Sequence, residues 1–303
     1  MKIGTRGSKL ALWQAHEVQR VIKEKFPQME TEIVVIKTKG DKILDVSLSK
    51  IGDKGLFTKE IEHALMAGEI DMAVHSFKDM PTELSEDLVV GAVLPRADVR
   101  DVFVSKDGRK LSEMTSKDKI GTSSLRRKAQ LLAYNPDLQI VDIRGNVETR
   151  LQRMNDGFCD AIVMAGAGFI RLGYEAQITE YFNEEVMLPA VSQGAVAIEV
   201  READEQITEV MDAINDDDAW TECMAERSLL RTLEGGCQVP VACRSKVEGE
   251  DFTMTALVAS LDGAKVIRES ISCSADWASE KAIELGELIL SKGAKEILDS
   301  IRK

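Results

Sequence analysis

The chain has 303 residues, of which 44% are hydrophobic and 30% charged, and its formal net charge is −13. This length predicts two or three domains, and the composition is typical of a globular rather than a disordered protein. The acidic balance argues against nucleic acid or an anionic membrane as a partner, because both are polyanions. Any anion-binding site must therefore be a local basic cluster.

The first half of the chain alternates strand-like and helix-like segments. Strands are expected at 2–5, 31–38, 71–75 and 88–94, and helices around 11–22 and 61–66. The motif Lys-Ile-Gly-Thr at 2–5 recurs at 119–122, and the spacing Gly-x-x-Asp-x-x-Val at 68–74 recurs at 157–163. These echoes predict two similar α/β lobes, and in such lobes ligands bind beyond the carboxyl ends of the strands, in a cleft.

The last third of the chain has a different pattern. An Asn-Asp-Asp-Asp run at 215–218 marks a boundary, and a helix is expected at 221–233. Two strands, at 252–260 and 264–272, flank an Asp262-Gly263 pair that predicts a hairpin turn. A helical region closes the chain, so we expect a small α+β domain here.

Basic and hydroxyl residues gather where predicted strands end and helices begin. Free amides at a helix start attract anions, and the forked guanidinium of arginine suits a carboxylate. Any single arginine of this kind could be an ordinary solvated side chain, but several strand ends together favour one anion site. The residues concerned are Arg6, Ser8, Ser124, Arg126, Arg127, Arg144, Arg150 and Arg171.

Two other segments leave alternatives open. Asp79 follows Lys78 at the end of a predicted strand, so it is either a turn aspartate that binds local amides or a carboxylate inside a cationic pocket. The segment 50–57 has glycines beside lysines and is either a solvated surface turn or a mobile loop over a cleft.

The cysteines and histidines indicate a reducing compartment without a catalytic metal. The five cysteines are an odd number without a Cys-x-x-Cys pair, and the three histidines lack metal-ligand spacing. Cys237 lies in a Gly-Gly-Cys loop, which makes it the best candidate for covalent chemistry. The first residues lack the apolar run of a signal peptide and no stretch is long enough to cross a bilayer, so we expect a cytoplasmic protein.

Taken together, these motifs resemble the porphobilinogen deaminase family, also called hydroxymethylbilane synthases. The resemblance runs the length of the chain, and its motifs occur in the family's order. Asp53, where some relatives carry glycine, is a departure that affects only the loop. The matching segments are 5–14, 54–57, 75–79, 121–127, 144–147, 188–195 and 233–240.

The resemblance implies an α/β fold with two lobes like those of periplasmic binding proteins and a small α+β C-terminal domain. It places domain 1 at 1–95 and 195–213, domain 2 at 100–190 and domain 3 at 217–303. It also implies that four porphobilinogen molecules are joined head to tail, with loss of ammonia, into linear hydroxymethylbilane. The primer would be a dipyrromethane cofactor attached to Cys237 through a thioether.

The resemblance also implies roles for individual residues. Asp79 would be the catalytic acid and would stabilise a developing cation. The cofactor carboxylates would be held by Lys78, Ser124, Arg126, Arg127 and Arg144. The substrate or growing chain would be bound by Arg6, Ser8, Gln14, Arg150 and Arg171, with Arg144 shared. The mobile loop would contribute Lys50, Lys54 and Phe57.

Two other classes of protein remain open at this point. One is a two-lobe solute-binding protein for a polycarboxylate, without chemistry, although we expect no export signal. The other is a transferase that uses Cys237 as its nucleophile, although no histidine lies nearby in the sequence to act as a base. For the family reading we expect a monomer that binds the small molecule porphobilinogen and neither nucleic acid nor a membrane.

Overall fold

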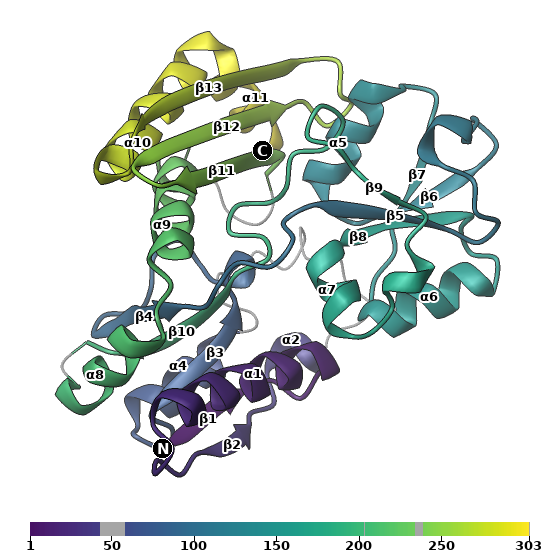
Figure 1. Cartoon of the computed structure of the whole chain (residues 1–303). Coiled ribbons are helices and arrows are strands. Elements are labelled where there is room, and N and C mark those ends of the chain that lie inside the picture. Colours follow the sequence, from purple (N-terminus) through teal and green to yellow (C-terminus); the bar gives the residue numbers. More distant parts are fainter. Residues whose placement is uncertain (43–57, 203, 234–238, 303) are drawn as a thin grey trace. The chain divides into compact units, whose positions relative to one another are not determined.

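The computed structural model describes residues 1–42, 58–202, 204–233 and 239–302. The chain forms two compact units, each assembled from two stretches of sequence. The first unit comprises residues 1–97 and 194–220, and the second comprises residues 98–193 and 221–303. Both units combine sheets with covering helices (Figure 1).

The first unit contains a five-stranded sheet in the order β2-β1-β3-β10-β4. Its strands are β1 (Lys2–Thr5), β2 (Glu32–Val35), β3 (Met72–Ser76), β4 (Leu88–Val93) and β10 (Val196–Arg201). The strand β1 runs parallel to both neighbours, whereas β10 is antiparallel to β3 and β4. A segment from late in the chain thus lies inside the sheet built by the first hundred residues.

Helices cover both faces of this sheet. The apolar stripes of α1 (Lys9–Lys25) and α8 (Glu205–Ile214) share one hydrophobic core with the strands. The helix α4 (Lys59–Met66) buries Ile61, Ala64 and Leu65 against residues of β3 and β4 in a second core. A short helix, α2 (Lys39–Lys42), ends the first described stretch of the chain. The sheet is therefore shielded from water on both sides, as its apolar strands require.

The second unit contains a sheet of the same pattern, in the order β7-β6-β8-β5-β9. Its strands are β5 (Asp101–Ser105), β6 (Lys119–Gly121), β7 (Gln139–Val141), β8 (Ala161–Ala165) and β9 (Glu180–Tyr181). Here β6 is parallel to β7 and β8, and β5 is antiparallel to β8 and β9. The core on one face includes residues of α5 (Leu125–Tyr134), and that on the other includes α6 (Val147–Asn155) and α7 (Gly166–Arg171).

The sequence echoes have a structural basis. The amide of Lys2 donates to the carboxylate of Asp71 at 2.7 Å, and the amide of Lys119 donates to Asp160 at 2.9 Å. In return the amides of the two aspartates donate to the carbonyls of the same two lysines, at 2.9 and 2.8 Å. The same clasp therefore joins β1 to β3 in one lobe and β6 to β8 in the other, which explains why both motifs recur in the same order.

The second unit also holds the C-terminal elements. They are α9 (Asp217–Thr232, whose first residues belong to the first unit), an antiparallel sheet of β11 (Val241–Glu248), β12 (Asp251–Ala259) and β13 (Val266–Ser274), and the helices α10 (Ala278–Ile289) and α11 (Lys295–Arg302). The hairpin turn between β12 and β13 contains Gly263 at φ +72°. A Cβ at this position would lie 2.3 Å from the backbone nitrogen of Ala133 at the end of α5, so the turn accepts only glycine without rearrangement.

The expected fold class is confirmed: two α/β lobes of like topology and a small sheet-and-helix C-terminal part. The hairpin predicted at Asp262-Gly263 is also confirmed, and the strand expected at 31–38 is shorter, covering Glu32–Val35. The division into three domains stays a prediction, because the second lobe and the C-terminal elements lie together in one compact unit.

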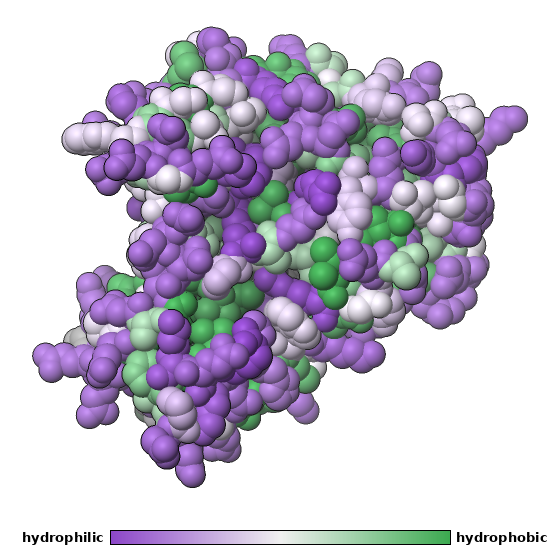
Figure 2. Space-filling model, viewed as in Figure 1, coloured by the Kyte–Doolittle hydropathy of each residue, from purple (hydrophilic) through white to green (hydrophobic). Residues whose placement is uncertain are grey.

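The face of the molecule seen in Figure 2 carries mainly hydrophilic residues, with smaller apolar areas between them. The large apolar side chains, among them Phe77, Phe103, Phe169 and Phe252, are buried. In the parts of the chain that the structure describes, no helix has both the length and the apolar character needed to cross a membrane.

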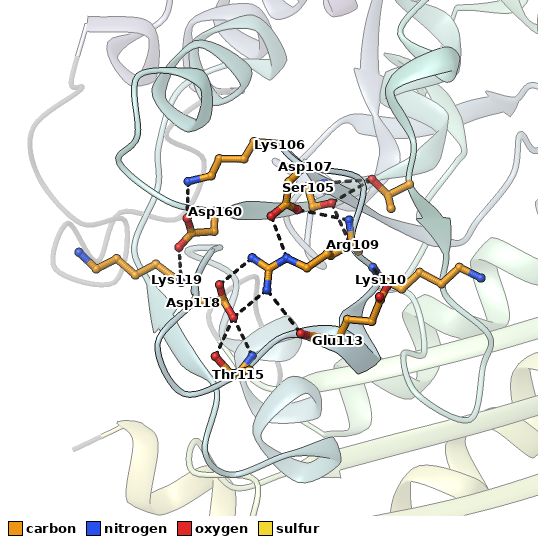
Figure 3. Close-up of polar contacts among 11 residues, drawn as sticks. Ser105, Lys106, Asp107, Arg109, Lys110, Glu113, Thr115, Asp118, Lys119 and Asp160 are labelled. Atoms are coloured by element: carbon orange, nitrogen blue, oxygen red, sulfur yellow. Dashed lines mark hydrogen bonds and ion pairs between the residues drawn. The ribbon is translucent and has the colours of Figure 1, made fainter.

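A network of charged side chains stabilises the loop before β6 (Figure 3). The guanidinium of Arg109 donates to both carboxylate oxygens of Asp118, at 2.8 and 3.1 Å, and also to Asp107 at 2.8 Å. Asp118 accepts two further hydrogen bonds from Thr115, both at 2.8 Å. These donors, the Arg109 guanidinium above all, hold the pKa of Asp118 well below its usual value.

We expect Asp118→Asn to lower the free energy of unfolding at pH 7 by about 1 kcal/mol, the upper range for a partly exposed ion pair. Because the pKa of Asp118 is lower in the folded state, its carboxylate stabilises the fold fully at pH values above the pKa of an unfolded aspartate, about 3.9. This stabilisation is lost as the pH falls toward the pKa in the folded state. Urea unfolding at pH 7 and pH 3 should therefore show the difference from the parent shrinking at the lower pH. The control is Asp137→Asn, and a difference independent of pH would contradict the assignment.

Candidate active site

A small pocket opens beside the carboxyl ends of β1 and β3 in the first unit. Its volume is about 80 Å³. Seven of its ten lining residues are polar or charged: Arg6, Ser8, Gln14, Thr58, His75, Ser76 and Asp79. Apolar side chains from Leu10, Ala11 and Val74 complete the wall. The position agrees with the rule that ligands bind beyond the carboxyl ends of strands in α/β sheets.

The sequence positions these side chains through three local structures. Arg6 directly follows β1, and the hydroxyl of Ser8 caps α1 by accepting a hydrogen bond from the amide of Ala11 at 3.3 Å. Gln14 lies in the second turn of α1. Asp79 ends a short 3-10 helix that follows β3 directly. Four of the predicted site residues therefore line one pocket, although they come from separate segments of the chain.

Hydrogen bonds fix two sides of the pocket wall. The side-chain amide Nε2 of Gln14 donates to the hydroxyl of Ser76 at 2.9 Å, which joins α1 to the end of β3. The imidazole Nε2 of His75 lies 3.0 Å from the carboxylate Oε2 of Glu199, which is completely buried on β10. These contacts limit the movement of the side chains that surround the pocket.

The carboxylate of Asp79 is exposed at this wall. Within residues 1–42, 58–202, 204–233 and 239–302, it has no hydrogen-bond or ion-pair partner. The 3-10 turn closes without it, because the amide of Met80 donates to the carbonyl of Phe77 at 3.2 Å. The structure therefore does not support a turn aspartate that caps local amides, and the carboxylate remains available to a ligand. Lys78 is half-buried in the same turn.

In the second unit, the start of α5 carries a buried ionic network. Arg126 and Arg127 are 5% and 6% exposed, and Asp101 at the start of β5 is fully buried. Asp101 accepts from Nη1 of Arg126 at 2.6 Å and from Nη2 of Arg127 at 2.7 Å. Burial lowers the pKa of the Arg127 guanidinium, and the charge of Asp101 acts in the opposite direction. Two cations face one carboxylate, so the network carries a net positive charge.

The two arginines differ in the donors that they leave available. Arg127 uses Nε and Nη2 on Asp101 and Nη1 on the carbonyl of Val163. Arg126 uses only Nη1 in the described structure, on Asp101 and on the carbonyl of Leu188. Its Nε and Nη2 can therefore still donate to an anion. The hydroxyl of Ser124 caps α5 by accepting from the amide of Arg127 at 3.4 Å.

The remaining predicted arginines of the second unit are Arg144, between β7 and α6, Arg150 in α6, and Arg171 in α7. Arg144 precedes Gly145, which has a φ of +111°, and Nε of Arg150 donates to the carbonyl of Gly145 at 2.8 Å. Arg171 is the last residue of α7, and all three arginines are half-buried. The predicted residues thus form two groups, one in each unit, and the single cleft expected from the sequence stays a prediction.

Four predicted residues, Lys50, Lys54, Phe57 and Cys237, lie outside the described residues. The described cysteines are Cys159, Cys223 and Cys243, which are buried, and Cys273, which is partly exposed. Burial raises the pKa of the Cys159 thiol to about 11, which makes it unreactive at neutral pH. The assignment of covalent attachment to Cys237 stays a prediction.

Sequence reasoning missed Asp101 and Thr58. Asp101 opens an apolar stretch, and a charged residue in that position is a signal for a buried partner. Thr58 directly precedes α4, a position where threonine commonly caps a helix, but the structure shows no side-chain cap hydrogen bond and places the residue in the pocket lining. Neither role follows from the linear sequence alone.

Comparisons with known proteins identify the family. The model of the porphobilinogen deaminase dipyromethane cofactor binding domain matches residues 1–209, and that of the porphobilinogen deaminase C-terminal domain matches residues 220–295. Porphobilinogen deaminase of Syntrophomonas wolfei is 48% identical over 100% of this chain and 99% of its own. That of Desulforamulus reducens is 49% identical over 99% and 97%, respectively.

Among solved structures, the periplasmic aliphatic sulphonate binding protein SsuA from Escherichia coli is 12% identical to this chain. The superposition covers 77% of this chain and 70% of the SsuA chain, with a TM-score of 0.41. This likeness is too low to carry a functional argument. The two family models and the full-length relatives are sufficient without it. The chain belongs to the porphobilinogen deaminase family.

Proposed function

We propose that this chain is a monomeric, cytoplasmic hydroxymethylbilane synthase that joins four porphobilinogen molecules head to tail with loss of ammonia. The observation that carries the proposal is the pocket in which Arg6, Ser8, Gln14 and Asp79 meet. Family membership supplies the reaction class, a transferase of tetrapyrrole biosynthesis with a dipyrromethane cofactor. The proposed domains are those expected from the sequence, 1–95 with 195–213, 100–190 and 217–303.

The charge of the ligand explains why an acidic protein needs these basic residues. Each pyrrole ring of porphobilinogen carries an acetate and a propionate, so every added ring brings two negative charges. Arginine donors at strand ends offset this charge and orient the rings through paired hydrogen bonds. We assign substrate and chain binding to Arg6, Ser8, Gln14, Arg150 and Arg171, with Arg144 shared, and loop functions to Lys50, Lys54 and Phe57.

The residues of the second unit fit an anionic cofactor. The network of Arg126, Arg127 and Asp101 has an excess positive charge, and two donors of Arg126 remain available. When bound, the dipyrromethane supplies the free pyrrole carbon from which the chain grows. The residues that would hold it are Cys237, through a thioether, and Lys78, Ser124, Arg126, Arg127 and Arg144.

Asp79 is the proposed catalytic residue. Its carboxylate accepts no hydrogen bond from the described protein and faces the pocket, so it can accept one from a pyrrole N–H instead. Loss of ammonia leaves a positive charge on the substrate, and a nearby carboxylate lowers the free energy of that state. The same oxygen can hold or pass on the proton that the departing amine requires.

The attachment site is tested by intact-mass measurement. The mass of the protein without substitutions is expected to exceed the mass calculated from its sequence by one dipyrromethane. The Cys237→Ser protein should have the calculated mass, because it lacks the thiol that forms the thioether. The matched control is Cys273→Ser, which removes a partly exposed cysteine and should keep the added mass.

The reaction itself is tested by incubating the protein without substitutions with porphobilinogen and measuring the ammonia that is released. A solute-binding protein would bind porphobilinogen without releasing ammonia, and that outcome would overturn the proposed function. A Cys237→Ser protein that keeps the added mass would overturn the attachment site only.

A further inference from the structure

The pocket lining contains a buried hydroxyl that the protein itself does not use. Thr58 is 2% exposed, and its Oγ1 has no hydrogen-bond partner in the described structure. The residue lies in the lining together with Arg6, Ser8 and Gln14. Buried polar groups are nearly always hydrogen-bonded, since an unpaired one forfeits the bonds that it made with water. An unpaired hydroxyl beside an anion-binding pocket therefore requires an explanation.

The obvious structural role of Thr58 is not fulfilled. A threonine before a helix usually adopts an extended conformation and accepts a hydrogen bond from an amide of the first turn. Thr58 precedes α4, but its φ of −116° and ψ of −32° are helical, and its side chain makes no cap bond. Only its backbone serves the helix, because its carbonyl accepts from the amide of Glu62 at 2.8 Å.

The size of the pocket determines what the hydroxyl could meet. A cavity of about 80 Å³ is larger than the roughly 10–15 Å³ that one water molecule needs, so it can hold a small polar group. A carboxylate group of a ligand fits such a space. The lining offers a guanidinium from Arg6 and hydroxyls from Ser8 and Thr58, and these groups donate hydrogen bonds to a carboxylate.

We infer that Thr58 is a further substrate-binding residue, whose hydroxyl donates a hydrogen bond to a carboxylate of the pyrrole substrate in this pocket. The inference rests on the proposed function for the identity of the ligand. The substrate carboxylate would then be the hydrogen-bond partner that Oγ1 of Thr58 lacks in the described structure. The free protein carries the desolvated hydroxyl at a cost in stability, and the substrate removes that cost when it binds.

The test is Thr58→Val, which replaces the hydroxyl by a methyl group of the same shape. Removing an unpaired buried hydroxyl should raise the melting temperature of the free protein by about 2 °C. Losing a hydrogen bond to a charged ligand should raise KM for porphobilinogen about tenfold, with kcat within a factor of two. Thr58→Ser, which keeps the hydroxyl, should restore KM. Intact mass verifies that both variants carry the cofactor.

The matched control is Thr179→Val in the second unit. The hydroxyl of Thr179 accepts from the amide of Ser105 at 3.1 Å, so its removal should lower the melting temperature and leave KM unchanged. A Thr58→Val protein with normal KM, or one that is destabilised like the control, would overturn the inference. Either outcome would leave the proposed function intact, provided that the protein without substitutions releases ammonia from porphobilinogen. If that protein releases no ammonia, the proposed function itself is refuted.

Discussion

Asp79→Asn is expected to reduce kcat by about 100- to 1,000-fold, the range seen when one preorganised electrostatic group is removed from an active site. Asparagine keeps the size of the side chain but has no negative charge to stabilise a cation and no site that can hold a proton. The carboxylate accepts no hydrogen bond within the described residues, so its loss should leave the free energy of unfolding unchanged. Single-turnover ammonia release measures the rate, and intact mass checks that the cofactor is present.

The control for this variant is Asp87→Asn. Asp87 is also an exposed turn aspartate of the first unit, and its φ of +67° is a conformation that asparagine tolerates equally well. We expect full turnover from it, because it does not line the pocket. Near-normal turnover by Asp79→Asn would remove Asp79 from the mechanism and leave the pocket as a binding site only.

Much of the fold could be predicted because it depends on local and repeated signals. The clasps between Lys2 and Asp71 and between Lys119 and Asp160 require the same residues at the same spacing, so each lobe carries a visible copy. The Asp262-Gly263 turn requires a positive φ, which glycine adopts without strain. The two-residue strand β9 (Glu180–Tyr181) carries no such signal, because its pairing with β5 is decided by tertiary context.

The candidate site divides in a similar way. Arg6, Ser8 and Asp79 could be predicted because they directly follow strands, and the carboxyl ends of parallel strands lie at one edge of a sheet. The unpaired hydroxyl of Thr58 could not, because a threonine before a helix predicts a cap. The partner of Arg126 and Arg127 could not be predicted either, because Asp101 reaches them only through the antiparallel pairing of β5 with β8.

Asp101→Asn is expected to have a large effect on stability, because Asp101 is the buried partner of Arg126 and Arg127. It should lower the free energy of unfolding by about 3–5 kcal/mol. The carboxylate is fully buried and accepts from both arginines and from the side-chain amide Nε2 of Gln193 at 3.1 Å. Asparagine fills the same space but leaves two guanidiniums buried without an opposing charge. Urea unfolding at pH 7 measures the effect, and the Cys237→Ser background keeps a difference in bound cofactor from contributing to it.

The same substitution at an exposed ion pair separates burial from charge. Asp98 pairs with Arg100 at 2.6 Å, with side chains 23% and 47% exposed, so water screens both charges. Asp98→Asn should therefore cost at most about 1 kcal/mol. If Asp101→Asn costs no more than this control, the buried arginines do not depend on Asp101 for charge compensation. A second variant, Asp101→Asn with Arg127→Gln, removes one of the uncompensated cations and should recover part of the lost stability.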